Sequence, residues 1–299
     1  MVGQKTKSRK VFQLFNTCFF IFMIFICLMP VLHVIFASFS DAKWVMSQTG
    51  LIWHIEGFNL NGYKMVMQNR SLMISYLNTI VYVFTSTGIG MLATVMGAYV
   101  LSRKNFLWRN VIMFMITFTM LFSGGIIPLY LVVTKTLSLY DSRWAVILPT
   151  CINAFNLIIV RTAIANVPPA LEESAMLDGA GRMRILFQII LPLIKATVAT
   201  IILYYAVGHW NSWFHASIFL RTRDKYPLQL VMKEILISGD ISSTAASTMS
   251  SSDFSGDTVL YKQLIKYCTI VMSSAPVFIF YPFIQKYFEA GVMIGSIKE

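Results

Sequence analysis

Apolar residues occur along this chain in long runs, not in the alternating pattern of half-buried strands. Each run is about 20 residues long, enough for an α-helix to cross the ~30 Å hydrocarbon layer of a membrane. The sequence shows no series of amphipathic strands of the barrel type, so helices are the only spanning elements that it predicts. The expected fold is all-α and polytopic, with six transmembrane helices at about 15–37, 74–100, 111–133, 144–164, 193–213 and 267–287.

Composition excludes an ordinary soluble domain. The 299 residues are 57% hydrophobic and only 12% charged, whereas soluble domains carry about 25% charged residues. The net charge of +11 comes from Lys and Arg residues that lie between the apolar runs. They do not cluster into a patch of the kind that binds the grooves of a nucleic acid. This distribution indicates membrane orientation and argues against a nucleic-acid partner.

The basic residues predict which side of the membrane each loop occupies. Four of them precede the first apolar run, which is longer than the apolar core of a cleavable signal peptide and is expected to remain as an anchor. Because Lys and Arg are retained in the cytoplasm, residues 1–14 are expected inside, and six crossings then place the tail 288–299 inside as well. On this topology 13 basic residues lie inside and 11 outside, six of the latter in the long external segment 214–266. Long loops count weakly toward orientation, so the comparison becomes 13 to 5 in favour of cytoplasmic termini.

Two features of the sequence lie on the expected outer side of the membrane, a break in the third span and a long external segment. Gly124, Gly125 and Pro128 should break the third span near its outer end, either to line a translocation path or to allow close helix packing. In the external segment, residues 228–235 place apolar side chains on one helix face, and the Ser/Thr/Ala-rich tract 242–255 is too polar to pack alone. Both parts could be connectors or docking elements for an external partner.

No catalytic or metal-binding pattern is visible. The four cysteines are scattered in or beside apolar runs, and the four histidines lack ligand spacing. No nucleophile elbow, paired carboxylates or Gly-x-x-x-x-Gly-Lys-Ser/Thr phosphate loop occurs. The chain is therefore not expected to be an enzyme or to bind a metal.

The internal loop 168–192, between the fourth and fifth spans, has the pattern of a helix, a sharp turn and a second helix. Pro168 and Pro169 suit the first positions of a helix, and the two glutamates that follow lie near its positive end. Gly179 supplies the positive-φ residue of a reversal. Apolar residues at 186, 189, 190 and 193 then predict a second helix with one apolar face. Such a hairpin could seat in a groove of a soluble partner or lie on the membrane surface.

At these residues the sequence resembles a known family. The segments Glu173-Ser174-Ala175, Asp178-Gly179-Ala180 and Ile190-Leu191-Pro192 are similar to the EAA loop of ABC-importer permeases. Ser174 departs from the family's alanine, and Ala196 stands where sugar permeases often have proline. The stretches 122–130, 148–149, 208–214, 226–229 and 286–291 extend the resemblance to the carbohydrate-uptake branch, in particular to the smaller maltose-transporter permease subunit. Within that branch it is closest to permeases of complex oligosaccharides, some of them uronate-containing.

The resemblance implies a pore-forming permease subunit in a bacterial inner membrane, importing a carbohydrate that an extracytoplasmic solute-binding protein delivers. Its partners would be a second homologous permease and two ATP-binding subunits, which would bind ATP and magnesium, so that this chain needs no cofactor. Residues of the loop would couple the permease to an ATP-binding subunit, namely Glu172, Glu173, Ala175, Asp178, Gly179 and Ala180. Glu173 could contact that subunit or only complete the start of the helix.

Polar residues stranded in apolar runs are candidates for the substrate path. A polar side chain at membrane depth costs free energy unless it has a partner, so it faces another helix or a wet cavity. The candidates are Asn78, Asn153, Asn156, Trp210 and Asn211, which combine amides with an aromatic platform for sugar rings. Interhelical hydrogen bonding is the competing interpretation for each of them.

Two other functions compete with a sugar permease. A permease for an amino acid or phosphate would share the internal loop but not the Trp210–Asn211 segment. An independent secondary transporter should carry charged residues within its spans and inverted repeats, and neither is apparent in the sequence.

Overall fold

The computed structural model describes residues 7–238 and 258–296, and within those ranges every regular element is helical. Its contacts divide the chain into two compact units, 1–70 with 235–274 and 71–234 with 275–299, which are treated separately. The longer helices are α1 (Lys7–Phe39), α4 (Arg70–Ser102), α5 (Arg109–Leu121), α8 (Ala154–Ala165), α12 (Lys195–Trp210), α14 (Leu228–Ser238) and α16 (Thr258–Ser296). The shorter α-helices are α2 (Ala42–Ser47), α3 (Asn61–Gln68), α6 (Ile126–Leu131), α7 (Arg143–Ile147), α9 (Pro169–Leu177), α10 (Arg182–Arg184), α11 (Leu191–Leu193) and α13 (Phe214–Phe219), with π-helical turns η1 (Val132–Thr136) and η3 (Ile185–Ile190) and 3₁₀ turns η2 (Leu148–Thr150) and η4 (Arg223–Lys225).

In the first unit, α3 packs tightly against the first part of α16. A Cβ at Gly62 would lie 2.7 Å from Cys268 Sγ, so only glycine permits this approach. The end of α1 joins the same cluster because the Ser38 hydroxyl lies 2.7 Å from the Tyr63 hydroxyl. The most apolar stretch of α1 is exposed along its whole length, as expected for a helix whose surroundings are lipid or other chains.

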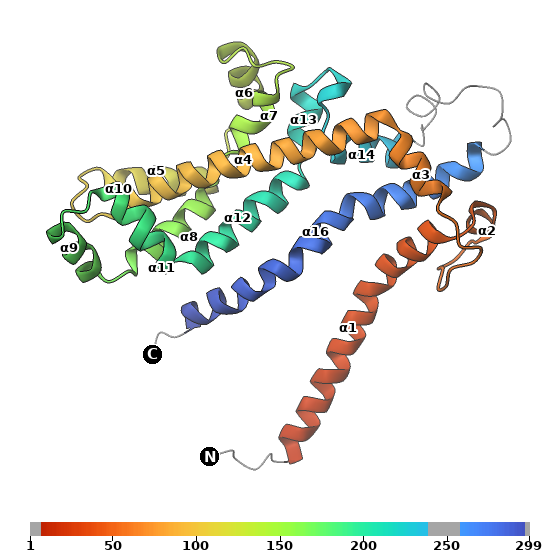
Figure 1. Ribbon diagram of the computed structural model, residues 1–299, viewed down its shortest axis with the longest axis horizontal. Helices are drawn as coiled ribbons and strands as arrows, with labels where there is room; N and C mark the ends of the chain where they lie inside the picture. Colours follow the sequence, from red (N-terminus) through yellow and green to blue (C-terminus); the bar gives the residue numbers. More distant parts are fainter. Residues whose placement is uncertain (1–6, 239–257, 297–299) are drawn as a thin grey trace. The chain divides into compact units, whose positions relative to one another are not determined.

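In the second unit, α4 is the helix on which the other elements assemble (Figure 1). Its C-terminal half shares a buried apolar core with α8, α9, η3 and α12, to which it contributes Val95, Ala98 and Tyr99. In its middle, a Cβ at Gly90 would lie 2.2 Å from the carbonyl oxygen of Cys151, so the backbone after η2 rests directly on α4. The Thr94 hydroxyl is hydrogen-bonded to that of Tyr205 on α12 at 2.7 Å. Glycine and small polar side chains therefore let helices approach closely, as in membrane bundles.

The helices of the structure can be compared with the predicted spans by length and composition. Ser8–Phe39 and Arg70–Ser102 are each long and apolar enough to cross a membrane as unbroken helices. The predicted third and fourth spans correspond to helix pairs bent at short breaks by 113° and 47°. The predicted fifth span corresponds to α12, and the 89° bend lies at its start, where α12 follows the segment Arg182–Leu193 of the internal loop. The predicted sixth span lies in α16, where Gln263–Ile279 forms a shorter apolar segment. The count of six spans stays a prediction.

Two local expectations can be compared directly. The third span does break at the expected place, since α5 ends at Leu121 and Gly125 adopts a φ of +82° before α6. The second helix of the internal loop is not a regular α-helix, because Ile185–Ile190 forms a π-helical turn. A π-turn shifts the following residues around the helix axis, so Leu186 and Ile190 are buried as predicted while Leu193 is 55% exposed.

The expected apolar face of the external helix is present in α14, where Leu228, Val231 and Ile235 are all buried. The tract 242–255 lies outside the described residues. The predicted tail beginning at residue 288 is helical as far as Ser296.

Candidate functional site

The six predicted coupling residues lie together on α9 and the turn that follows it. α9 buries one narrow face, formed by Glu172 and Ala175, and exposes the rest of its surface. Ala175 belongs to the apolar core shared by α4, α8 and α12. Pro169 at the first helical position sets the start of the helix, where a missing N–H costs nothing.

Glu172 is held by an ion pair that crosses from α9 to α4. Its carboxylate accepts a hydrogen bond from the guanidinium of Arg103, which directly follows the C-terminus of α4. The Arg103 guanidinium also lies 4.1 Å from the centre of the Tyr99 ring, on the last turns of α4. Glu172 is only 6% exposed. A buried carboxylate is tolerated only when it is paired, so this contact fixes α9 to the end of α4.

The turn after α9 is a Schellman motif centred on Gly179. The Ala180 N–H donates to the Ala175 carbonyl at 2.9 Å, and the Gly179 N–H donates to the Met176 carbonyl at 3.0 Å. These are the two hydrogen bonds that define the motif, with Asp178 as the C-cap and Gly179 in the left-handed conformation, at a φ of +79°. The glycine is needed for backbone conformation and not for space, because a Cβ there would meet nothing within 4 Å.

The outward face of α9 combines apolar and polar groups. Leu177 is 89% exposed, and Leu171, Met176 and Glu173 are also exposed. Among the described residues the Glu173 carboxylate has no ion-pair partner. A rigidly mounted helix with exposed Leu and Met side chains has the form of a ligand for a groove on another protein.

At the opposite end of α4, residues 221–226 form a basic loop that Asp141 fixes in place. This carboxylate accepts hydrogen bonds from the Arg221 and Thr222 N–H groups at 2.9 and 3.0 Å, and from the Thr222 hydroxyl at 2.6 Å. It also pairs with Lys225 Nζ at 2.8 Å. Lys225 is the main cause of a pKa of Asp141 far below its usual range, and the Thr222 and Arg221 bonds add to it. All of these partners favour the ionised carboxylate.

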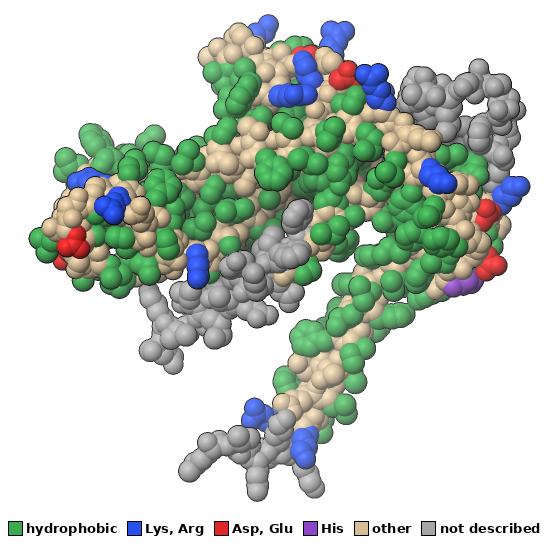
Figure 2. Space-filling view, viewed as in Figure 1, with side chains coloured by type: hydrophobic (Ala, Val, Ile, Leu, Met, Phe, Trp, Pro, Cys, Tyr) green, Lys and Arg blue, Asp and Glu red, His purple; other side chains and the backbone are tan. Residues whose placement is uncertain are grey.

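The side chains of α4 hold the other side of this loop. The Asn78 amide donates to the carbonyls of Asp224 and Tyr226 at 2.7 and 3.2 Å, and its oxygen accepts from Arg143 at 3.0 Å. Tyr82 donates to the Lys225 carbonyl at 2.6 Å. Figure 2 shows charged side chains gathered over this loop and again over the α9 end, with apolar surface between them.

The five candidate path residues are not gathered into one described cavity. Asn78 is buried and its amide group is fully used in holding the loop. Asn153 caps α8 by accepting from the Asn156 N–H at 3.1 Å, and Asn156 itself is buried. The Trp210 ring is buried edge-on against Tyr76, while Asn211 is exposed and donates to the Val207 carbonyl at 3.0 Å. Interhelical and capping roles thus account for most of these groups, and their place on a substrate path stays a prediction.

The sequence did not predict the ion pair that fixes α9 or the hydrogen bonds that fix the basic loop. In the sequence Arg103 is one of the 13 basic residues predicted to lie inside, and its partner Glu172 lies 69 residues away. Asp141 lies 80 residues from Arg221. No local spacing pairs such distant residues. The one local signal is that Arg103 directly follows α4.

The fold is that of a helical membrane protein, with two unbroken helices long and apolar enough to cross a membrane and with charged loops gathered at the two ends of α4. The chain belongs to the family described as "binding-protein-dependent transport system inner membrane component", whose model matches residues 86–293. It is therefore a permease of an ABC transport system, embedded in the membrane by several passes.

Known relatives match nearly the whole chain. It is 39% identical to the polygalacturonan/rhamnogalacturonan transport system permease protein YtcP of Bacillus subtilis (strain 168), covering 97% of this chain and 99% of the relative. It is 37% identical to Protein LplC of the same organism, over 98% and 97%. A solved structure, described as a bacterial ABC transporter involved in the import of the acidic polysaccharide alginate, matches with a TM-score of 0.86 and 30% identity, over 96% of this chain and 100% of that chain.

We predict that Asp141→Asn loosens the basic loop while leaving the helices in place. Asparagine keeps an oxygen acceptor and tolerates the positive φ of position 141, so the change isolates the lost charge. Amide hydrogen exchange at Arg221 and Thr222 should accelerate roughly three- to tenfold, the range expected for weakened hydrogen bonds at an accessible site. Asp224→Asn, an exposed neighbour, is the matched control and should leave both rates unchanged.

The depressed pKa of Asp141 also sets a pH dependence. A carboxyl group with a lowered pKa in the folded state stabilises it fully above the unfolded pKa of about 3.9, and this stabilisation is lost as the pH falls through the folded value. Protection of the two amides, corrected for intrinsic exchange, should therefore be constant between about pH 7 and pH 5. A loss of protection within that interval would contradict the assignment.

Proposed function

We propose that this chain is a pore-forming permease subunit of an ABC importer for acidic oligosaccharides, delivered by an extracytoplasmic solute-binding protein. The observation that carries the substrate class is the full-length similarity to two systems. One is described for polygalacturonan and rhamnogalacturonan, polymers that contain galacturonate, and the other for alginate, described as acidic. Carboxylate-bearing sugars are the chemistry these systems share.

The outer loop of this chain supports an acidic substrate. Arg221 and Arg223 are exposed there, Lys225 is half-buried, and Arg143 lies beneath them against Asn78. Asp141 neutralises Lys225 and Glu234 pairs with Arg223 at 3.4 Å, whereas Arg221 has no ion-pair partner among the described residues. With the exposed Asp224 included, four cations face three carboxylates here, which leaves one positive charge in excess. A surplus of positive charge at the mouth of a pathway raises the local concentration of an anionic ligand.

In this mechanism α9 is the coupling helix. Its exposed Leu171, Met176 and Leu177 would seat in a cleft of an ATP-binding subunit, with Glu173 at the edge of the contact, and the Glu172–Arg103 pair would pass the displacement to α4. Two ATP-binding subunits bind ATP and magnesium and hydrolyse the nucleotide, and a second homologous permease completes the pore. This chain then needs no catalytic group or cofactor, and both of its termini lie in the cytoplasm.

Uptake by the reconstituted complex tests the function. The complex is purified through a tag on this chain, identified by mass spectrometry and placed in proteoliposomes with its binding protein. Galacturonate or alginate oligosaccharides should accumulate in an ATP-dependent manner and stimulate ATP hydrolysis, and neutral maltooligosaccharides of the same length should do neither. Equal uptake of the neutral sugars would refute the substrate class, and uptake without ATP would refute the class of transporter.

We predict that reversing one charge of the Arg103–Glu172 pair uncouples transport and that reversing both restores it in part. Arg103→Glu and Glu172→Arg each place two like charges in a mostly buried contact, whereas the double variant recreates an ion pair with opposite polarity. The measurement is sugar transported per ATP hydrolysed, in complexes shown to assemble to the same extent. A purely structural pair would change assembly but not this ratio.

Substitution of Gly179 should also uncouple ATP hydrolysis from transport. Gly179→Val forces a β-branched residue into a φ of +79° and should cost about 1–3 kcal/mol at the turn. We expect the ATPase activity that the loaded solute-binding protein stimulates to fall about tenfold. Gly181→Val is the matched control, because Gly181 has equal space around it but an extended backbone, with a φ of −70°. Equal loss in both variants would contradict a role for the Schellman turn.

A further inference from the structure

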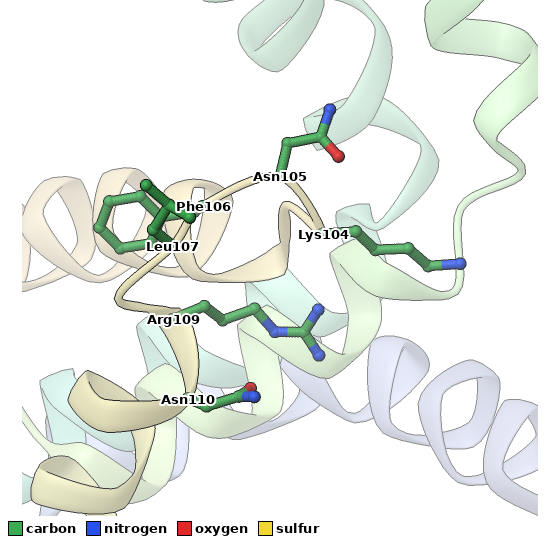
Figure 3. Close-up of a pocket in the computed structure, with 6 residues that line it drawn as sticks. All are labelled: Lys104, Asn105, Phe106, Leu107, Arg109 and Asn110. Carbon is green, nitrogen blue, oxygen red and sulfur yellow. The ribbon is translucent and has the colours of Figure 1, made fainter.

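The loop between α4 and α5 forms an open surface cavity that the transport mechanism does not use. Six residues line it, and its volume is about 420 Å³ (Figure 3). The lining combines two cations, two amides and two apolar side chains, and it contains no acid: Lys104, Asn105, Phe106, Leu107, Arg109 and Asn110. A space of this size with such a lining suits a compact anion that carries several acceptor oxygens.

The two cations of this cavity are available for a ligand. Lys104 and Arg109 extend in the same direction from the two ends of the loop (Figure 3). Neither side chain forms an ion pair within the described part of the chain. The Nε of Arg109 is buried and has no hydrogen-bond partner there. A buried guanidinium donor without an acceptor is costly, so the site favours an anion that would supply one.

An apolar ridge leads away from the cavity along α5. Leu107 is 95% exposed and Trp108 is 64% exposed. Farther along the helix, Phe114, Phe118 and Phe122 are exposed on one side, and consecutive rings lie 6.2 and 4.4 Å apart. A cationic cavity, an interfacial tryptophan and an exposed apolar ridge follow one another in the order of headgroup, interface and acyl chain across a leaflet.

We propose that residues 104–110 bind the headgroup of an anionic phospholipid, with its acyl chains lying against the phenylalanine ridge of α5. The phosphodiester would accept hydrogen bonds from Lys104 and Arg109, and the two asparagines would bind the polar part beyond it. A free phosphate would use the cavity but leave the ridge uncovered. A sibling permease would cover the ridge but would have to bring an acidic group into the cavity.

Lipid selectivity of the intact complex tests this site. The complex is transferred to nanodiscs that hold equal amounts of phosphatidylglycerol and phosphatidylcholine with matched acyl chains, and lipids retained after delipidation are counted by native mass spectrometry. We expect retention of phosphatidylglycerol over phosphatidylcholine. Lys104→Gln with Arg109→Gln should lower that preference by about tenfold or more, since each basic residue near a membrane surface contributes measurably to anionic-lipid binding. Lys43→Gln with Lys64→Gln removes two exposed charges elsewhere and should leave it unchanged.

Three results would overturn the proposal. The first is an unchanged preference in the Lys104/Arg109 variant. The second is displacement of the retained lipid by excess inorganic phosphate, which would identify a free-anion site. The third is cross-linking of Trp108 or Phe114 to the sibling permease in the assembled complex, which would give the ridge a protein occupant. The second and third measurements use complexes with both cations intact, so they decide the question even if the double variant fails to assemble.

Discussion

The buried ion pair between Arg103 and Glu172 is the interaction on which the proposed mechanism depends. It joins a long apolar helix to a short amphipathic one, and it lies where the helix leaves the membrane-spanning part of the chain. Ala175 enters the core one turn later, so α9 is attached through both a charge and an apolar contact. Two contacts on one face leave the other face of α9 free. A helix held in this way can be pushed by a partner without losing its orientation.

Because α4 is unbroken, it connects the attachment of α9 to the opposite end of the unit. α4 contains 33 residues, which corresponds to a length of about 50 Å. Arg103 and Tyr99 lie at one end, and Asn78 and Tyr82 hold the basic loop near the other. The predicted third and fourth spans are bent at breaks, whereas α4 is not. Within this unit α4 is therefore the element through which a displacement at α9 would reach the basic loop.

Sequence alone could predict what depends on local pattern and could not predict what depends on distant pairing. The apolar run of α4, the glycine turn at Gly179 and the break at Gly125 follow from periodicity and from the backbone needs of single residues. The π-turn η3 did not follow, because a core that selects Ile185, Leu186 and Ile190 together overrides the regular period. The Asp141 network could not be predicted either, because Asp141 lies about 80 residues from its partners. For Asn78 the sequence offered hydrogen bonding within the protein as one of two interpretations, but it did not identify the loop that the amide holds.

The magnitudes involved are consistent with the Arg103–Glu172 contact surviving the motion that it would transmit. Removing one partner of a buried ion pair typically costs about 3–5 kcal/mol, because the remaining charge is left unpaired. The cost is lower here, since 31% of the Arg103 side chain is exposed, but the Tyr99 ring below the guanidinium adds to the attachment. Allosteric coupling between two sites is typically about 1–3 kcal/mol. A contact that costs as much as or more than the coupling free energy to break would stay formed during the motion, so the Arg103–Glu172 pair is expected to keep α9 attached to α4 throughout.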